Sequence, residues 1–434
     1  MPSFPAALTV RRRIALLASA AIIATVVAAP IGASAASPVT RFATFNASLN
    51  RGAAGQALTH LSAPGNAQAN AVAEIIQRVR PEILLINEFD YYAPTAAHPD
   101  GPLVDAFRDN YLEIGQNGAQ PIDYPYSFVA PPNSGVSSGF DLNNNGVTDT
   151  TPGDGSYGDD SLGFGVFEGQ FGMVVYSQHP ILAEDARTFQ HFLWKDMPGA
   201  RLPDDPATPA AHDWYNAQEL AIFPLSSKSH WDVPIDVDGT VVHFLVSHPT
   251  PPVFDGAEDR NGTRNADEIR LWADYITAGP TADYIYDDEG TFGGLTPGAA
   301  FVIAGDQNSD PLDGDSIPGS IQQLLDHPLV NTKVTPWSEG GAYWSDVQNF
   351  LNDNHRSDPQ HDTADFCDTP AFPPCSGPGN LRADYVLPRK SLKIVDAAVF
   401  WPFPPDPLVR LTGTGFPVPS SDHRLVWVDV RVPG

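Results

Sequence analysis

Runs of apolar residues with the composition of β-strands recur along the whole chain. Each run is six to ten residues long, and several lack the polar alternation of a half-exposed strand. Such continuous runs are typical of strands that are covered on both faces. The pattern predicts eight strands, at residues 41–46, 82–88, 170–177, 241–248, 301–306, 382–388, 392–401 and 424–432.

Two segments between these strands show helical periodicity. In residues 66–81 the apolar side chains recur every three or four positions, and Pro81 ends the pattern. Residues 265–278 show the same period. Strands and helices therefore mix along the chain, as they do in proteins of the α/β and α+β classes.

Three long segments rich in Pro, Gly, Asp and Asn interrupt this pattern, near residues 91–165, 190–235 and 310–380. No helix–strand unit is evident in them, and many of the 43 prolines lie there. Loops of this length in a compact domain are usually functional or are insertions. Because the sequence shows no internal repeat and no clean linker, we predict one domain, residues 36–434, with three large insertions.

Residues 1–35 have the pattern of a secretory signal peptide. A basic start at Arg11–Arg13 precedes an apolar run that ends in small residues, so cleavage is expected after Ala35. A retained membrane anchor is the alternative, but Pro30 and Gly32 interrupt the apolar run. We therefore expect a secreted or extracytoplasmic protein without a retained anchor, and both the general and the twin-arginine export routes stay open.

The chain is strongly acidic, with a formal net charge of −28. Removal of the signal segment, which holds three arginines and no acidic residue, would take this charge to −31. Avid, sequence-blind binding of nucleic acid depends on Lys and Arg at the phosphates, so it is not expected here. A phosphate-ester substrate is still compatible with this charge if a bound metal ion supplies the local positive charge.

Polar residues that can bind a metal ion or transfer a proton stand at the tips of the predicted strands. One such residue would be explained by a turn, since Asp and Asn favour strand ends. A repeated pattern instead indicates a site, because ligands in α/β folds collect at the carboxyl ends of strands. The residues are Asn46, Glu88, His248, Asp306, Asn308, Asp384, Asp422 and His423. Carboxylates for a hard cation and imidazoles for proton transfer suit metal-assisted hydrolysis of a phosphate ester.

This ordered set resembles the endonuclease/exonuclease/phosphatase superfamily (the DNase I-like proteins), from about residue 40 to 432. The resemblance implies a four-layer α/β (α+β) sandwich, in which two mixed β-sheets pack face to face between helices. It implies a monomeric metal-dependent phosphoesterase that uses Mg²⁺, or Mn²⁺ or Ca²⁺ in its place.

The resemblance also implies roles for the strand-tip residues. Glu88 is similar to the family's main metal ligand, with Asn46 nearby and Asp422 as a further ligand. Asp306 resembles the residue that orients or deprotonates the attacking water. Asn308 resembles the residue that binds a phosphate oxygen.

The two histidines complete the implied catalytic set. His423 resembles the terminal histidine at the scissile phosphate, paired with Asp384, and His248 resembles the second histidine of the DNase I-like and sphingomyelinase-like branches. At Gln170 and Phe171 this chain departs from relatives that have Tyr or Arg near the same strand. The histidines favour phosphodiester cleavage, of nucleic acid or a phospholipid headgroup, over monoester cleavage of sugar or inositol phosphates. A non-catalytic, calcium-binding exported module on the same fold is the other alternative.

A second candidate metal site lies in the predicted insertion "DLNNNGVTD". Oxygen-bearing side chains alternate there around Gly146, as in a calcium loop, but Pro152 stands where such a loop has Glu. The alternative is a plain turn rich in Asn and Gly. The possible ligands of a structural Ca²⁺ are Asp141, Asn143, Asn145 and Asp149.

The chain has only two cysteines, Cys367 and Cys375. In an exported protein a disulfide between them is the favoured interpretation. Closing this nine-residue loop should stabilise the fold by about 2–3 kcal/mol on the loop-entropy model. Mass spectrometry of the exported protein should therefore find no free thiol, and two free thiols would refute the pairing.

Overall fold

The computed structural model describes residues 38–348, 352–366, 377–414 and 417–433, which belong to one compact unit. The predicted signal peptide and both cysteines lie outside the described residues. Within the described ranges, no helix is both long and apolar enough to cross a membrane.

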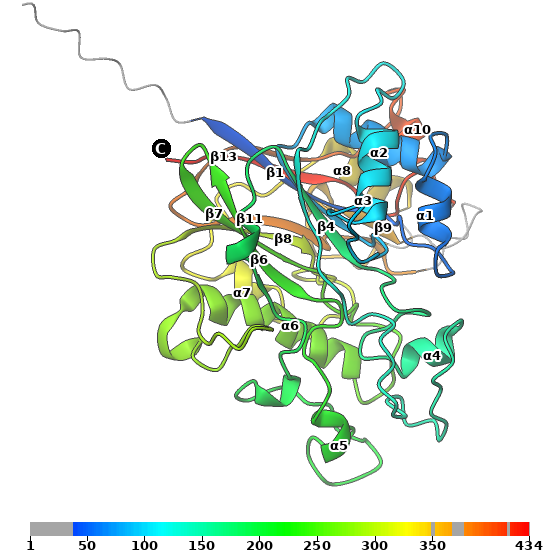
Figure 1. Ribbon diagram of the computed structural model, residues 1–434, viewed down its shortest axis with the longest axis vertical. Helices are drawn as coiled ribbons and strands as arrows, with labels where there is room; N and C mark the ends of the chain where they lie inside the picture. The colour runs from blue at the N-terminus through cyan, green and yellow to red at the C-terminus, as the bar shows by residue number, and fades with distance from the viewer. Residues whose placement is uncertain (1–37, 349–351, 367–376, 415–416, 434) are drawn as a thin grey trace, which may run out of the picture. The chain divides into compact units, whose positions relative to one another are not determined.

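Two large mixed sheets form the centre of the fold (Figure 1). The first sheet has the strand order β12-β13-β1-β2-β4-β3, and the second has the order β11-β8-β7-β6-β5. The strands of the first sheet are β1 (Val39–Asn46), β2 (Ile83–Asn87), β3 (Tyr126–Phe128), β4 (Met173–Ser177), β12 (Lys393–Val399) and β13 (Val426–Arg431). Those of the second are β5 (Arg187–Thr188), β6 (His230–Val237), β7 (Thr240–Ser247), β8 (Ala300–Asp306) and β11 (Asp384–Pro388). A separate hairpin-like pair consists of β9 (Ala364–Phe366) and β10 (Gly379–Leu381).

Successive side chains of a strand point to opposite faces of its sheet. One set packs in an inner core between the two sheets, and the other packs in outer cores beneath the helices. Phe42, Ile83 and Leu85 of the first sheet lie in one buried cluster with Phe244 and Val302 of the second. The rings of Phe42 and Phe244 meet with their centroids 5.7 Å apart. The two sheets therefore pack face to face through these inward residues.

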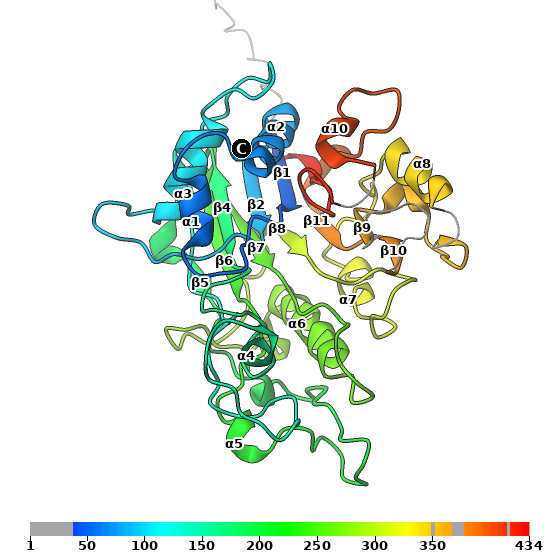
Figure 2. The same cartoon turned by 90° about the vertical axis from the view of Figure 1, so that its right-hand side faces the viewer.

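Helices cover the outer faces of both sheets, as Figures 1 and 2 show from two sides. The outward residues Phe45 and Leu84 pack with Ile75 and Ile76 of α2, and Ile303 of β8 packs with Trp272 of α6. The helices are α1 (Gln56–Leu61), α2 (Ala67–Val79), α3 (Pro102–Phe107), α4 (Gly155–Asp159), α5 (Ala217–Leu220), α6 (Arg260–Thr277), α7 (Gln322–Leu325), α8 (Glu339–Val347) and α10 (Val409–Thr412). Shorter turns of helix are η1 (Arg108–Leu112), η2 (Ala183–Asp185), η3 (Trp194–Asp196), η4 (Gly279–Thr281) and η5 (Pro359–His361). The four-layer sandwich implied by the resemblance is confirmed.

All eight predicted strands and both predicted helices are present, but the prediction that the three long segments hold no helix–strand unit was wrong. Residues 91–165 contain α3, β3 and α4, and residues 310–380 contain α7, α8 and β9. The segment 190–235 was predicted to hold no helix–strand unit, whereas β6 begins at His230 and pairs with β7 along its whole length. Pro234 and two acidic residues obscured this strand. Proline is tolerated at this position because its carbonyl accepts from Leu182, on the side away from β7, so the missing N–H takes no bond from the β6–β7 ladder; on that outer side β5 pairs only with Trp231 and Asp232.

Candidate functional site

The strand ends of both sheets meet at one edge of the sandwich. In the first sheet, the parallel strands β1 and β2 end together, so that Asn46 lies beside Asn87. In the second sheet, β11 begins where β8 ends, and Asp384 lies opposite Asp306. The Asn46 side chain donates from Nδ2 to Asp306 Oδ2 over 3.0 Å and thereby joins the two edges.

Six of the eight strand-tip residues are linked to one another by direct side-chain contacts. We call these six the strand-end cluster: Asn46, Glu88, His248, Asp306, Asp384 and His423. Five of the six are at least 95% buried, and Glu88 is half-buried. The remaining two residues, Asn308 and Asp422, adjoin the cluster through their neighbours in the chain.

Glu88 is held at the first sheet in an unusual backbone conformation. It directly follows β2 with a φ of 57°, in the left-handed region that residues with a Cβ rarely adopt. Its Oε1 accepts a hydrogen bond from Asn46 Nδ2 at 3.1 Å. Burial, with the nearby charge of Asp422 as the next cause, raises the pKa of Glu88 to about 7. The carboxylate therefore occupies a place where its own negative charge is poorly compensated.

Asp306 lies at the centre of the cluster. Its Oδ2 is 3.5 Å from His248 Nε2 and 3.6 Å from His423 Nε2, in addition to its bond from Asn46. Burial alone would raise the pKa of Asp306, but the charge of His423 and the hydrogen bonds from His248 and Asn46 outweigh burial and hold the pKa below its usual range. Asp306 is thus a buried carboxylate that stays ionised.

His423 lies between two carboxylates. Its Nδ1 is 2.9 Å from Asp384 Oδ2, and Thr363 Oγ1 donates to that same oxygen over 2.8 Å. Burial opposes protonation of His423, but Asp384 and Asp306 raise its pKa well above the usual value. Burial raises the pKa of Asp384 to about 6 against the lowering effect of His423. The result is an Asp–His–Asp array with a cationic imidazole in the middle.

His248 differs from His423 in charge. Burial, followed by the positive charge of Lys228, lowers the pKa of His248 to about 4 in spite of the nearby Asp306. Its Nδ1 is buried and has no hydrogen-bond partner in the described part of the chain. The site therefore holds one neutral and one charged histidine beside the same oxygen of a single carboxylate.

Asn308 is placed beside the carboxylate that precedes it. It has a φ of 51°, and its main-chain N–H donates to Asp306 Oδ1 over 2.8 Å. Its Nδ2 donates to the carbonyl of Pro249 at 3.1 Å. The turn that the Asp–Asn spacing suggests is therefore present, and it presents both residues at the same edge as the two histidines.

The oxygen atoms at Glu88 and Asp422 suit a hard divalent cation. In the part of the chain that the structure describes, neither carboxylate has a cationic side chain within ion-pair distance, and each raises the electrostatic cost of the other. Among the described residues, the Asp422 carboxylate receives hydrogen bonds only from the hydroxyl groups of Ser48 and Ser421, at 3.3 and 3.4 Å. A divalent cation with oxygen ligands would relieve this repulsion.

A second set of possible ligands lies within the cluster. Ligand atoms of Asp306, Asp384 and His423 lie within 4.8 Å of one another. His423 directs Nδ1 to Asp384, and its pKa is raised well above the ordinary value, so a protonated ring already balances the two carboxylates. We therefore favour Glu88 over this set as the principal metal ligand.

Sequence reasoning missed Lys228, which is 6% exposed. Burial lowers its pKa, while the charges of Glu268, Glu88 and Asp306 raise it in part. Within the described ranges, no carboxylate comes within ion-pair distance of its ammonium group. It was missed because it lies in a predicted insertion, where "SSKSH" shows no strand-tip pattern.

Supporting residues were missed for a different reason. Asn87 Oδ1 accepts from the Asp306 N–H at 3.2 Å, and Thr363 fixes Asp384, yet neither stands out in the sequence. Asn87 was overshadowed by its neighbour Glu88. Nothing in the sequence around Thr363 signals a contact with a residue 21 positions later.

The candidate calcium loop forms a tight turn, and none of its hydrogen bonds among the described residues goes to the strand-end cluster. Asp141 accepts hydrogen bonds from the N–H groups of Asn145 and Gly146, at 3.0 and 2.7 Å. Asn143 and Asn145 likewise accept from main-chain N–H groups of the loop, and Asp149 Oδ1 accepts from Thr151. Among the described residues, these acids do not converge into a group of three possible ligands. Calcium binding at this loop stays a prediction.

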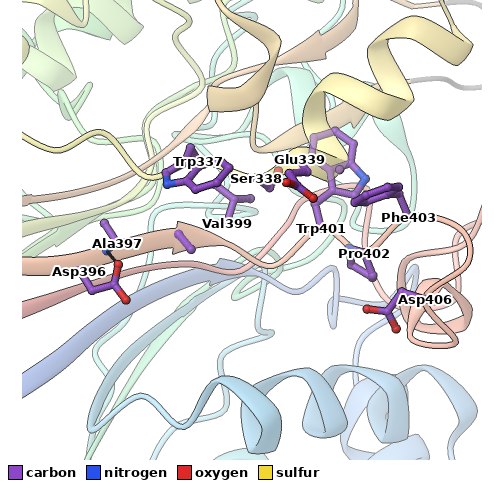
Figure 3. A pocket seen from close by; sticks show the side chains of 12 residues that line it. Trp337, Ser338, Glu339, Asp396, Ala397, Val399, Trp401, Pro402, Phe403 and Asp406 are labelled. Atoms are coloured by element: carbon purple, nitrogen blue, oxygen red, sulfur yellow. Dashed lines mark hydrogen bonds between the residues drawn. The ribbon is translucent and has the colours of Figure 1, made fainter.

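A shallow hollow of about 320 Å³ lies elsewhere, between the start of α8 and β12 (Figure 3). Trp337, Trp401 and Phe403 line it together with Glu339 and Asp396. It contains no member of the strand-end cluster. The hollow is therefore separate from the strand-end cluster.

Comparison with known proteins gives a consistent family. The model of the "Endonuclease/Exonuclease/phosphatase family" matches residues 43–423. No curated protein matches the sequence.

Similar solved structures include an endonuclease/exonuclease/phosphatase from Beutenbergia cavernae DSM 12333, with 16% identity and a TM-score of 0.46, covering 91% of this chain and 72% of that one. A family protein from Leptotrichia buccalis C-1013-b has 13% identity and a TM-score of 0.43, covering 91% and 100%. Sphingomyelinase C from Streptomyces griseocarneus has 14% identity and a TM-score of 0.36, covering 90% and 99%.

The left-handed conformation of Glu88 predicts an unusual order of stabilities. Replacing a residue at positive φ by Gly removes strain that Ala retains, so Glu88→Gly should be more stable than Glu88→Ala by about 1 kcal/mol. Urea unfolding in the presence of EDTA measures this difference. At Glu184, in the exposed turn η2 and without positive φ, the order should be reversed. Equal stability of the two Glu88 variants would contradict the strain.

Proposed function

The chain belongs to the endonuclease/exonuclease/phosphatase family, whose members are metal-dependent phosphoesterases and nucleases, and we propose that it is an exported phosphodiesterase whose active site is the strand-end cluster. The single observation that carries this proposal is the contact set around Asp306. One ionised, buried carboxylate oxygen meets Asn46, His248 and His423 at 3.0–3.6 Å. Such a carboxylate can orient a water and accept its proton.

The residues of the second sheet would carry the proton transfer and the stabilisation of charge. Asp306 orients the attacking water and, in spite of its low pKa, would accept its proton where a bound cation makes that water more acidic. His423, held by Asp384, is positively charged and stabilises the negative charge that develops on the phosphate oxygens. His248, which is neutral, directs Nε2 to Asp306 and so helps to hold that carboxylate in place.

Two further groups would bind the phosphate. The Lys228 ammonium group has no ion-pair partner among the described residues, so its positive charge is available to a phosphate oxygen. Asn308 supplies an amide at the same edge, next to Asp306. This pair gives an otherwise acidic protein a local preference for an anion.

The metal-binding residues of this proposal are Glu88 and Asp422, with Asn46 adjacent. The repulsion between the two carboxylates and the raised pKa of Glu88 support a divalent cation there, Mg²⁺ or Mn²⁺ or Ca²⁺. When bound, such an ion supplies positive charge against the phosphate oxygens and makes a water more acidic. Asn46 donates to both Glu88 and Asp306 and so holds the metal-binding and water-activating carboxylates at a fixed separation.

The substrate is proposed to be a phosphodiester of modest size. The two histidines favour a diester, because His248 and His423 resemble the histidines of the branches that cut diesters, and one of them can protonate or stabilise the leaving oxygen. The net charge of −28 disfavours tight binding of a long polyanion. A phospholipid headgroup or a short nucleic acid fits these conditions.

The function is tested by hydrolysis of bis-p-nitrophenyl phosphate with and without EDTA. We expect EDTA to abolish the activity and Mg²⁺ to restore it. Glu88→Gln should lower the activity by orders of magnitude and recover it partly at high metal concentration, because the shape remains and the ligand charge is lost. Glu82→Gln is the matched control, at the other end of β2. Activity that ignores EDTA would exclude the metal mechanism.

Asp306 and Asn308 should fail in different ways when they are replaced. Asp306→Asn keeps the size but loses the charge, so kcat should fall by about 10²–10⁴-fold with little change in KM. Asn308→Ala should lower kcat less and raise KM more, because it loses a hydrogen bond to the phosphate. Steady-state kinetics separate the two effects. If both variants keep activity within a few-fold and only the melting temperature changes, the pair is a structural turn.

A further inference from the structure

The β7–β8 ladder of the second sheet stops before it reaches the site. The parallel pairing of β7 with β8 runs from Val242 and Ala300 to Val246 and Ala304. His248 and Asn308 lie beyond the last pair, and Lys228 precedes the first residue of β6. The β6–β7 ladder ends at the pair His230–Ser247, so all three side chains lie just beyond the last sheet pairs of these strands.

Helix α6 supplies the missing connection through Glu268, which is fully buried. Its Oε1 accepts the N–H of Ser227 and its Oε2 accepts the N–H of Thr250, both at 2.6 Å. Ser227 directly precedes Lys228, and Thr250 follows His248 by two residues. One carboxylate therefore binds both segments just beyond the last β6–β7 pair.

Asn265, one turn earlier on the same helix and also fully buried, holds a third segment. Its Nδ2 donates to the carbonyl of Thr250 at 2.8 Å and to that of Gln307 at 2.9 Å. Gln307 stands between Asp306 and Asn308. The main chain of Thr250 is thus bound on both its N–H and its carbonyl side by α6.

We propose that Asn265 and Glu268 are positioning residues, which hold the segments of Lys228, His248 and Asp306 in one fixed arrangement at the reacting phosphate. This inference rests on the proposed function. It separates the site into two parts: α6 sets the part that binds phosphate and activates water, while the first sheet sets the metal-binding part at Glu88.

The helix does not need these two polar residues for its own packing. Its apolar side chains Ile269, Trp272 and Ile276 already pack in the core on the outer face of the second sheet. Burying a carboxylate and an amide is unfavourable unless each is hydrogen-bonded. The bonds that compensate here all go to segments that carry site residues, which favours a role in the site over a role in packing.

Position 267 offers a matched control on the same helix. Asp267 is also fully buried, and its Oδ2 accepts from Trp194 Nε1 at 2.8 Å and from the Arg201 N–H at 2.6 Å. These partners belong to the segment 194–201, which contributes no residue to the strand-end cluster. Asp267→Asn and Glu268→Gln therefore make the same chemical change at adjacent buried positions, and only the second touches the site segments.

The first test compares the two variants in Mg²⁺-supported hydrolysis of bis-p-nitrophenyl phosphate, well below both melting temperatures. Glu268→Gln replaces one acceptor by a donor that faces a main-chain N–H, so one segment is released. We expect kcat to fall by about 10- to 100-fold, as for other residues that orient catalytic groups. The Mg²⁺ concentration for half-maximal activity should stay within a few-fold, because Glu88 is not contacted. Asp267→Asn should keep kcat.

The second test does not depend on activity. In ¹H–¹⁵N spectra of the metal-free protein labelled at histidine, with His248 assigned from His248→Gln, the Glu268→Gln change should shift the His248 imidazole signals. Asp267→Asn should leave them in place. A wild-type protein without hydrolytic activity would refute the proposed function, while the shift of His248 would still report the positioning.

Two results would overturn the inference itself. One is a Glu268→Gln variant that keeps kcat within about twofold and shows unshifted His248 signals, since a 10-fold loss is the least that this role predicts. The other is an equal loss of kcat in both variants, which would show a general weakening of α6. Glu268→Asp, which keeps the charge but shortens the side chain, should recover less than half of the lost activity if the position of the segments is what matters.

Discussion

The whole arrangement depends on one amide group that spans the two sheets. Asn46 Nδ2 donates to Glu88 Oε1 in the first sheet and to Asp306 Oδ2 in the second. Two carboxylates would otherwise repel each other across this gap, and an uncharged donor between them reduces that repulsion without neutralising either one. The face-to-face packing of the sheets brings the strand ends together, and this amide turns their proximity into a defined distance between two chemically different carboxylates.

The electrostatic design of the site follows from its depth. The two halves of the site compensate the free-energy cost of burying charge in different ways. In the second sheet, His423 lies between Asp384 and Asp306 and balances them with hydrogen-bonded contacts. In the first sheet, burial and Asp422 leave Glu88 with a pKa of about 7. The excess negative charge on that side is the property that makes a divalent cation a natural partner.

The fold was largely predictable from the sequence, because local patterns of apolar residues indicate most of its strands and its long helices. Continuous apolar runs identified β1, β2, β4, β7, β8 and β13, and the period of α6 was visible in its apolar face. The strand β6 escaped notice because Pro234 and acidic residues break the run, and their tolerance depends on which neighbours pair at each position. The strand-tip residues were predictable for a related reason, since a polar residue that ends an apolar run is visible locally. Lys228, Thr363 and Glu268 were not, because their importance arises only from contacts between distant segments.

The pairing of the first strand with the last has a consequence for how the protein is made. β1 pairs with β13 from Val39 and Arg431 to Thr44 and Val426, so the sheet that holds Asn46 and Glu88 closes only when almost the entire chain is present. His423 also arrives just before that last strand. Contacts of such long sequence separation form late and slowly during folding. A nascent chain can therefore form helices and the β6–β7 hairpin early, but the strand-end cluster can assemble only after His423 and the residues of β13 have been added.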